Sequence, residues 1–234
     1  MIFKTPFSRR NFLTLAGVAG AGIAASACTG PIKPQDENGT VIEFLERQHG
    51  MLRRTIFILE EIRGGMDARM DLSPEILQGT VDIVSRLMVD YHQRIEEKYI
   101  YPAFDTAKKM GGLVGILREQ HAAGSQLTGI LKQLAAGFSA KDHEKRRTLG
   151  GAIHQFSRMY RAHADREDTV LLPVLRQVIT PVAYREMSKV FENEEKQAFG
   201  QNGLEELTRK LVGYEEALGI GDLAAFTPRV EDLR

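Results

Sequence analysis

The sequence predicts an all-α protein, an antiparallel four-helix bundle built from two pseudo-repeats and extended by additional helices at its C-terminus. Two observations indicate this class. Apolar residues recur at helical spacing through most of the chain, with Gly, Pro and Ser between the periodic runs. The motif His92-x-x-x-Glu96 returns as His163-x-x-x-Glu167, and each copy is followed by a proline at the same offset. The chain is therefore a tandem repeat of about 70 residues.

The first two helices have clear start signals. The segment Thr40-Val41-Ile42-Glu43 is a capping box that opens the first helix, whose apolar stripe runs to Gly64-Gly65. Ser73-Pro74 begins the second helix, with an N-cap residue and a proline where each is favoured. Because Pro102 lacks a backbone donor, we expect it to bend or end this helix near Tyr101.

The third and fourth helices repeat this plan. Gly111-Gly112 precedes the third helix, which stops before Gly137. The fourth helix begins at Ser139 or Asp142, and its apolar residues face inward as far as Pro173.

Two shorter helices should follow the bundle. Thr180-Pro181 opens one of them, and residues 204–218 form the other. We expect both helices to pack over one end of the bundle. The bundle domain then spans residues 39–219, and residues 220–234 form a flexible tail.

Charge and cysteine content exclude some classes. The 234 residues carry 31 basic and 31 acidic side chains, so nothing in the balance calls for nucleic acid. Apolar residues make up 43% of the chain, which is enough for one bundle with a buried core. The single cysteine excludes a disulfide within the chain.

The repeated residues are of metal-ligand types. Four residues along a helix rotate by about 40°, so the His and Glu of each motif lie on one face. Two further histidines, one in the first helix and one in the third, follow local sequences that are similar in the two repeats. Two His and one Glu per repeat, doubled, are what a carboxylate-bridged pair of iron or manganese ions needs, and thiolates are missing. The candidate ligands are His49, His92, Glu96, His121, His163 and Glu167.

Other ionisable residues near these motifs are less favoured as ligands by helix geometry. His143 and His154 face away from any site built on His163, because of their rotation around the helix. We expect Glu97 and Asp168 to be solvated, or to accept hydrogen bonds from the N–H groups of ligand histidines.

The order His49, His92-x-x-x-Glu96, His121, His163-x-x-x-Glu167 resembles the hemerythrin-like, or HHE cation-binding, family over roughly residues 39–200. The resemblance implies a four-helix bundle around a non-haem di-iron centre, with the two glutamates bridging the metals. It also implies reversible binding of oxygen or related small ligands, or sensing of iron or redox state.

The sequence departs from the oxygen-carrying members of that family. Those members have His-x-x-x-His on the third helix, whereas Ser125 stands four residues after His121 here. They also have His-x-x-x-x-Asp on the fourth helix; Asp168 stands five after His163, and a π-bulge could let it replace Glu167. The small pair Gly124-Ser125 should leave space for water or an exogenous ligand.

The ligand count leads to three functional hypotheses. Two six-coordinate metals offer about twelve positions. Four His fill about four of them, two Glu that each bind both metals fill about four, and a bridging oxide or hydroxide fills about two, which leaves about two. The first hypothesis is a non-enzymatic protein that binds or senses oxygen, nitric oxide, peroxide, iron or redox state with two Fe ions, or with Mn or Zn. The second is a di-iron oxidoreductase of peroxidase or ferroxidase type. The third is a structural metal-binding adaptor of an exported complex.

Residues 1–27 have the three regions of a secretory signal peptide. Basic residues precede an apolar run of about 14 residues, which is too short to cross a bilayer. The stretch Ser8-Arg9-Arg10-Asn11-Phe12-Leu13 resembles a twin-arginine signal, which makes the twin-arginine export machinery a partner and the periplasm the destination. That route exports folded proteins, so a metal site could be filled before export.

Cys28 allows two interpretations. Ala25-Ser26-Ala27-Cys28 resembles a lipobox, which would lipidate Cys28 and provide the chain's one attachment to a membrane. The same residues satisfy an Ala-x-Ala cleavage site that gives a soluble product. Residues 28–38 are a linker in either case.

Overall fold

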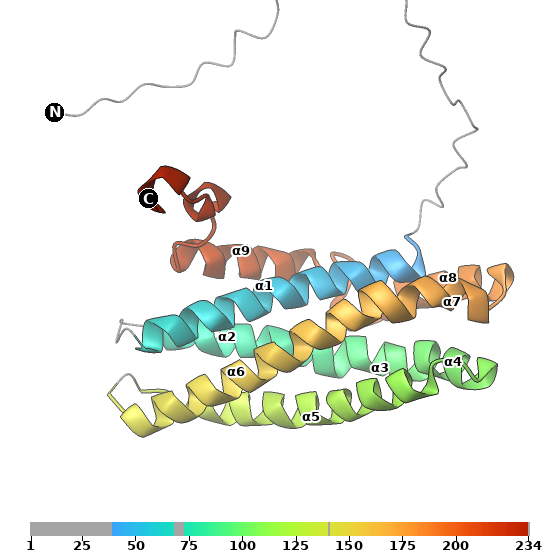
Figure 1. Cartoon of the computed structure of the whole chain (residues 1–234), viewed down its shortest axis with the longest axis horizontal. Coiled ribbons are helices and arrows are strands. Elements are labelled where there is room, and N and C mark those ends of the chain that lie inside the picture. The colour runs from blue at the N-terminus through green and yellow to red at the C-terminus, as the bar shows by residue number, and fades with distance from the viewer. Residues whose placement is uncertain (1–38, 68–72, 140, 234) are drawn as a thin grey trace, which may run out of the picture. The chain divides into compact units, whose positions relative to one another are not determined.

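The computed structural model describes residues 39–67, 73–139 and 141–233. The described chain is all-α, and four long helical rods run antiparallel side by side in it (Figure 1). The signal segment, the linker and Cys28 lie outside the described residues.

Each rod has the following parts. The first is α1 (Val41–Asp67). The second comprises α2 (Pro74–Val84), the π-helical segment η1 (Ser85–His92), α3 (Gln93–Ile95), the π-helical segment η2 (Glu96–Ile100) and α4 (Tyr101–Ala107). The third is α5 (Gly111–Ala136). The fourth comprises α6 (His143–Arg166), the π-helical segment η3 (Glu167–Leu171) and α7 (Leu172–Val178).

Local sequence accounts for the helix starts. Thr40 Oγ1 accepts from the Glu43 amide and the Glu43 carboxylate accepts from the Thr40 amide, which confirms the capping box of α1. Ser73 caps α2 through the amide of Ile76. Of the two predicted starts for the fourth rod, Asp142 is the N-cap, accepting from the amide of Lys145 at 3.0 Å.

Pro102 and Pro173 do not end their rods, so of the two outcomes expected at Pro102, a bend or an end, the end is wrong. Pro102 is the second residue of α4 and Pro173 the second of α7, and both helices continue for several residues. In each case a π-helical segment lies immediately before the helix that holds the proline. The wider π turn tolerates a ring without a backbone donor, so the rod continues. The two segments begin at Glu96 and Glu167, the repeated carboxylates.

The additional helices pack along the bundle rather than over its end. α8 (Pro181–Phe199) and α9 (Glu205–Ala217) both contact α1, and α9 also contacts α2. Tyr184 and Phe191 of α8 and Leu207 and Leu211 of α9 are buried against the bundle. Their amphipathic faces therefore lie against the first two rods, and Figure 1 shows α9 running alongside α1.

The chain continues after α9 with two short 3₁₀ helices, η4 (Leu223–Phe226) and η5 (Val230–Leu233). The sequence predicts a flexible tail over residues 220–234, but one residue of this segment packs on the first rod. The ring of Phe226 contacts that of Phe57, with 5.4 Å between the centroids.

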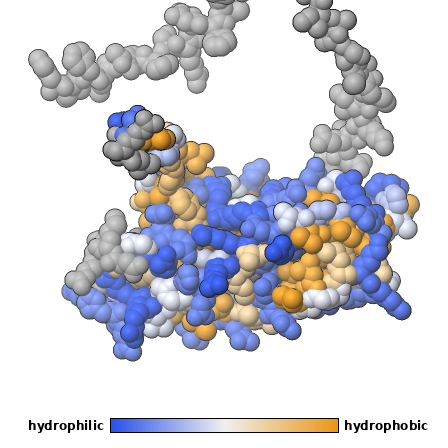
Figure 2. All heavy atoms as spheres, viewed as in Figure 1, coloured by the Kyte–Doolittle hydropathy of each residue, from blue (hydrophilic) through white to orange (hydrophobic). Residues whose placement is uncertain are grey.

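One apolar core fills the bundle, and the surface is mostly hydrophilic. Figure 2 shows apolar atoms gathering on the visible face where α4 and α7 run side by side. Among the described residues, no helix is both long enough and apolar enough to span a membrane.

Glu194 anchors α8 to the second rod, and its replacement by Gln should destabilise the fold. Its carboxylate accepts from Arg94 at 3.0 Å, Lys98 at 2.9 Å and Tyr99 at 2.8 Å. The hydrogen bonds from Lys98 and Tyr99 lower the pKa of Glu194 to about 2. A carboxyl whose pKa is depressed on folding stabilises the fold fully above its unfolded pKa of about 4.3, and that contribution is lost as the pH falls towards 2.

We therefore expect Glu194→Gln to lower the free energy of unfolding by about 1–2 kcal/mol at pH 7. Urea titrations from pH 7 down to pH 2.5 should show this difference shrinking below pH 4.5. The control is Glu186→Gln on the same helix, where the exposed pair with Lys189 should contribute about 0–0.5 kcal/mol. A loss for Glu194→Gln that is the same at every pH would contradict the assignment.

Candidate metal centre

The structure brings the six predicted side chains together in the interior of the bundle. They form two groups, in each of which one ligand atom per residue lies within 4.8 Å of the others. His49 and His92 belong to one group, and His121 and His163 to the other. Glu96 and Glu167 belong to both, and all six residues are buried.

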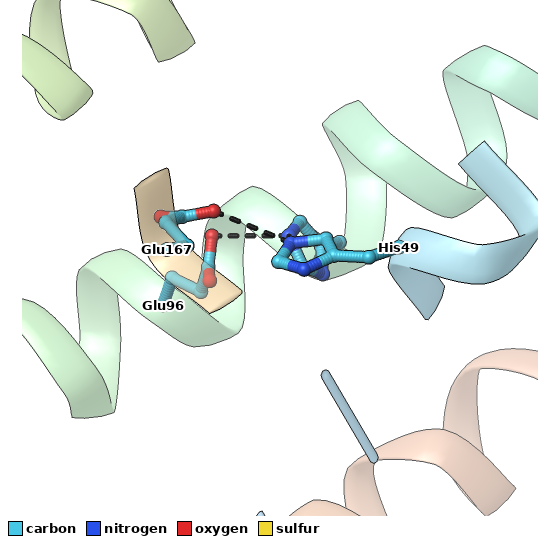
Figure 3. A group of neighbouring side chains, drawn as sticks. His49, Glu96 and Glu167 are labelled. Carbon is cyan, nitrogen blue, oxygen red and sulfur yellow. Dashed lines mark hydrogen bonds and ion pairs between the residues drawn. The ribbon is translucent and has the colours of Figure 1, made fainter. Parts of the chain in front are cut away.

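The distances show how the two groups share their carboxylates. Glu167 Oε2 lies 3.3 Å from His49 Nε2 and 3.1 Å from His163 Nε2. Glu96 Oε2 lies 3.1 Å from His92 Nε2 and 3.4 Å from His121 Nε2. Figure 3 shows the carboxylates of Glu96 and Glu167 facing the imidazole of His49 from one side. Each carboxylate therefore reaches from one pair of histidines to the other.

The outer nitrogen of every histidine in the centre has an acceptor. His49 Nδ1 lies 2.6 Å from Asp168 Oδ1, and His121 Nδ1 lies 3.0 Å from Glu97 Oε1. An acceptor at Nδ1 holds a ring proton there, so that Nε2 faces the interior as the nitrogen that can bind a metal. Within each group two Nε2 atoms then face each other, at 3.1 Å for His49 and His92 and at 3.2 Å for His121 and His163.

The sequence analysis missed two of these acceptors. His92 Nδ1 donates to Gln48 Oε1 at 2.8 Å, and His163 Nδ1 donates to Gln120 Oε1 at 2.9 Å. Each glutamine directly precedes a histidine of the centre, so each Gln-His pair provides one imidazole and orients another on a different rod. The return of this dipeptide at the same place in the second repeat was the available signal.

Tyr101 was also missed, and it makes the centre asymmetric. Its hydroxyl donates to Glu167 Oε1 at 2.8 Å and lies 3.1 Å from His121 Nε2. Burial, Glu96 and Glu167 all raise the pKa of Tyr101, which keeps the phenol protonated. The matching position of the second repeat is Leu172, so Glu96 has no equivalent donor.

The buried donor set fits metal cations. Both oxygens of Glu96 and one of Glu167 are buried without a hydrogen-bond partner among the described residues. Burying carboxylates is costly unless they meet a positive charge. Burial opposes a charge on His49, but Asp168 and Glu167 outweigh it and raise the pKa of His49 to about 10. Imidazole nitrogens and carboxylate oxygens are ligands that Fe, Mn and Zn accept.

Asp168 does not belong to either group. The π-helical segment that could have let it replace Glu167 as a ligand is present and begins at Glu167. It accepts from His49 and from Arg53 instead. His143 and His154 lie exposed on α6, away from the centre. Of the space expected beside Gly124-Ser125, the part at Gly124 is filled, because a Cβ there would lie 2.6 Å from Tyr160 Cζ, whereas Ser125 lines a surface hollow.

Removing the acceptor of His49 should weaken metal binding. Asp168→Ala leaves the His49 ring without its orienting partner, and we expect an affinity about 10- to 100-fold lower. The measurement is competition for Co²⁺ between the protein and a chelator. Asp165→Ala is the matched control, since Asp165 is exposed and contacts Arg53 at 3.2 Å but not His49. Equal affinities for the two variants would contradict this role.

The fold is an all-α bundle, and each of its two interior groups of His and Glu could hold a metal ion. These features place the chain in the class of cation-binding helical proteins. The chain belongs to the hemerythrin HHE cation-binding family. It matches the family described as Hemerythrin HHE cation binding domain over residues 40–175.

The chain is also similar to proteins from Mycobacterium bovis and Mycobacterium tuberculosis, whose names describe them as uncharacterized. Each is 35% identical over 231 residues, an alignment that covers 94% of this chain and 91% of the relative. No solved structure matches the chain.

Proposed function

We propose that this protein binds two iron ions in its interior and uses the centre to bind or sense a small ligand such as oxygen, nitric oxide or peroxide. The observation that carries the proposal is the arrangement of four inward Nε2 atoms around two shared carboxylates. Manganese or zinc could take the same ligands.

The chain's own residues prepare the site for cations. The four Nδ1 acceptors orient the imidazoles so that their Nε2 atoms face the interior, and a cation that binds there replaces the proton held by His49. Burial opposes ionisation of Glu167, but His163 and His49 hold its pKa well below the ordinary value. The centre therefore offers donors that are ready to bind a cation, and Tyr101 fixes one carboxylate oxygen of Glu167.

A bound iron pair supplies redox chemistry and positions for an external ligand. Six side chains provide fewer donor atoms than two six-coordinate metals accept, which leaves room for a small molecule. Among the described residues, the six members of the two groups are the only buried carboxylates and histidines. This favours ligand binding over a reaction that needs a separate acid or base.

The test is the metal content of the purified protein together with its absorption spectrum. We expect about two iron ions per chain, near-ultraviolet and visible absorption under air, and spectral changes on reduction and on addition of nitric oxide. Zinc alone, with no absorption and no response, would refute the proposal. Multiple turnovers of peroxide or Fe(II) would instead mark an oxidoreductase.

We also propose that the protein acts after export to the periplasm, either soluble or anchored through Cys28. The support is the twin-arginine-like stretch and the lipobox-like segment that lie within positions 1–28. Replacing Arg9 and Arg10 with Lys should retain the protein in the cytoplasm of a host that has the twin-arginine route. Unchanged export of that variant would refute the route.

A further inference from the structure

The two repeats place different residues at the protein surface on either side of the metal centre. Asp168 and Glu97 occupy equivalent positions of the two repeats, and each accepts from a histidine of the centre. Arg53 and Ser125 also occupy equivalent positions; Arg53 donates to Asp168, and Ser125 lines the same surface hollow as Glu97. An arginine on one face thus corresponds to a serine on the other.

The face beside His49 is closed by Arg53. Its guanidinium donates to Asp168 and to Asp165, and Asp168 is the acceptor of His49 Nδ1, so Arg53 lies on the outer side of that acceptor. The side chain of Asp168 is only 17% exposed beneath it.

The face beside His121 is open. Val89, Asp90, Gln93, Arg94, Glu97, Lys98, His121, Ala122 and Ser125 line a surface hollow of about 760 Å³. The side chain of Glu97, equivalent to Asp168, is 49% exposed there. The two cations of the rim, Arg94 and Lys98, are held by Glu194 of α8. They are therefore not positioned as Arg53 is.

Gln93 separates the hollow from the interior. It lines the hollow, yet its side chain is buried. Its amide accepts from Ser125 Oγ at 3.2 Å and donates to the hydroxyl of Tyr160, whose ring contacts His163. The equivalent position on the closed face is Ala164, which is fully buried.

We propose that small ligands and metal ions reach the centre from one side only, through the hollow beside His121, and that Gln93 with Ser125 is the gate. Arg53 closes the pseudo-symmetric side. This inference rests on the proposed metal centre and adds the route by which its ligands enter. Hydrogen bonds of one amide to two hydroxyls can break without unfolding a helix, so a side-chain movement suffices to open the gate.

The first test is Ser125→Arg, which places across Glu97 the residue that closes the other face. In iron-loaded, reduced protein we expect the association and dissociation rates of nitric oxide to fall together by about tenfold. The equilibrium affinity and the iron content should stay as in the wild type, because a gate changes passage and not the bound state. Stopped-flow absorption gives both rates.

A second pair of variants tests the route without touching the hydrogen bonds of the gate. Ala122→Phe fills the hollow, and Gly50→Phe places the same ring at the equivalent position of the closed face, in the first repeat. A Cβ at Gly50 meets nothing within 4 Å, and the urea midpoint of the variant checks that the ring leaves the fold intact. We expect slower binding for Ala122→Phe and a wild-type rate for Gly50→Phe.

Uptake of Co²⁺ by the metal-free variants, followed by visible absorption, separates the two proposals. A wild type that takes up no metal refutes the proposed function. A wild type that takes up metal, with unchanged uptake and nitric oxide rates for Ser125→Arg and Ala122→Phe, refutes the gate alone. Slower rates for Gly50→Phe than for Ala122→Phe would place the entrance on the other face and also refute it.

Discussion

Glu96→Ala should abolish binding of both metal ions, from about two per chain in the wild type to well below one. The reason is that Glu96 Oε2 lies within 3.4 Å of both His92 Nε2 and His121 Nε2, so the substitution removes a donor from both groups at once. Metal analysis of purified variants measures the effect. Glu96→Gln, which keeps the size of the side chain, should show the same loss if the carboxylate charge is what matters.

Histidine variants provide the matched controls. His92→Ala and His163→Ala should each reduce bound iron sharply, because each removes an inward nitrogen from one group. His154→Ala should leave about two ions per chain, since that side chain is exposed on α6. Equal losses for these three variants would contradict the assignment of histidines to faces.

Gly124→Ala should destabilise the bundle by about 1–3 kcal/mol, the usual cost of overpacking a filled core. The new Cβ would overlap Tyr160 Oη and lie 2.6 Å from Cζ of the same ring. Tyr160 is fully buried and packs on Phe156, with 4.6 Å between the ring centroids, so it has little room to move. Urea unfolding of the metal-free protein measures the change without the contribution of bound metal.

The control for this prediction lies on the same helix. Gly129 is exposed within α5 and a Cβ there meets nothing within 4 Å. Gly129→Ala should therefore stabilise the protein by about 0.5–1 kcal/mol, the gain expected for removing a helical glycine. The same sign of change in both variants would show that the close approach of Tyr160 is not what requires Gly124.

The candidate site could be predicted in part because helix geometry is local. His92 and Glu96 share a face through their spacing of four residues alone, and so do His163 and Glu167. The alignment of the two repeats then identified His49 and His121 as further candidate ligands. Gln48, Gln120 and Tyr101 could not be selected this way, because their partners are on other rods and depend on distances across the bundle.

Asp168 illustrates the same limit. A π-bulge could have brought it into the centre, and a π-helical segment does begin beside it at Glu167. Spacing on one helix could not decide between the two carboxylates. In the structure Asp168 contacts His49 of the first rod, and Glu167 is the carboxylate that lies in both groups.

The sequence by itself determined the helical class, the repeat, the capped helix starts and the shared face of each His-Glu pair, because these depend on interactions within about four residues. Only the tertiary structure decided that the rods continue through Pro102 and Pro173 and that α8 and α9 lie along α1. It also decided that Arg53 pairs with Asp168 on one face, while Ser125 lines a hollow on the other. These features depend on which residues of distant segments meet when the rods pack, and the period of a single helix carries no record of that.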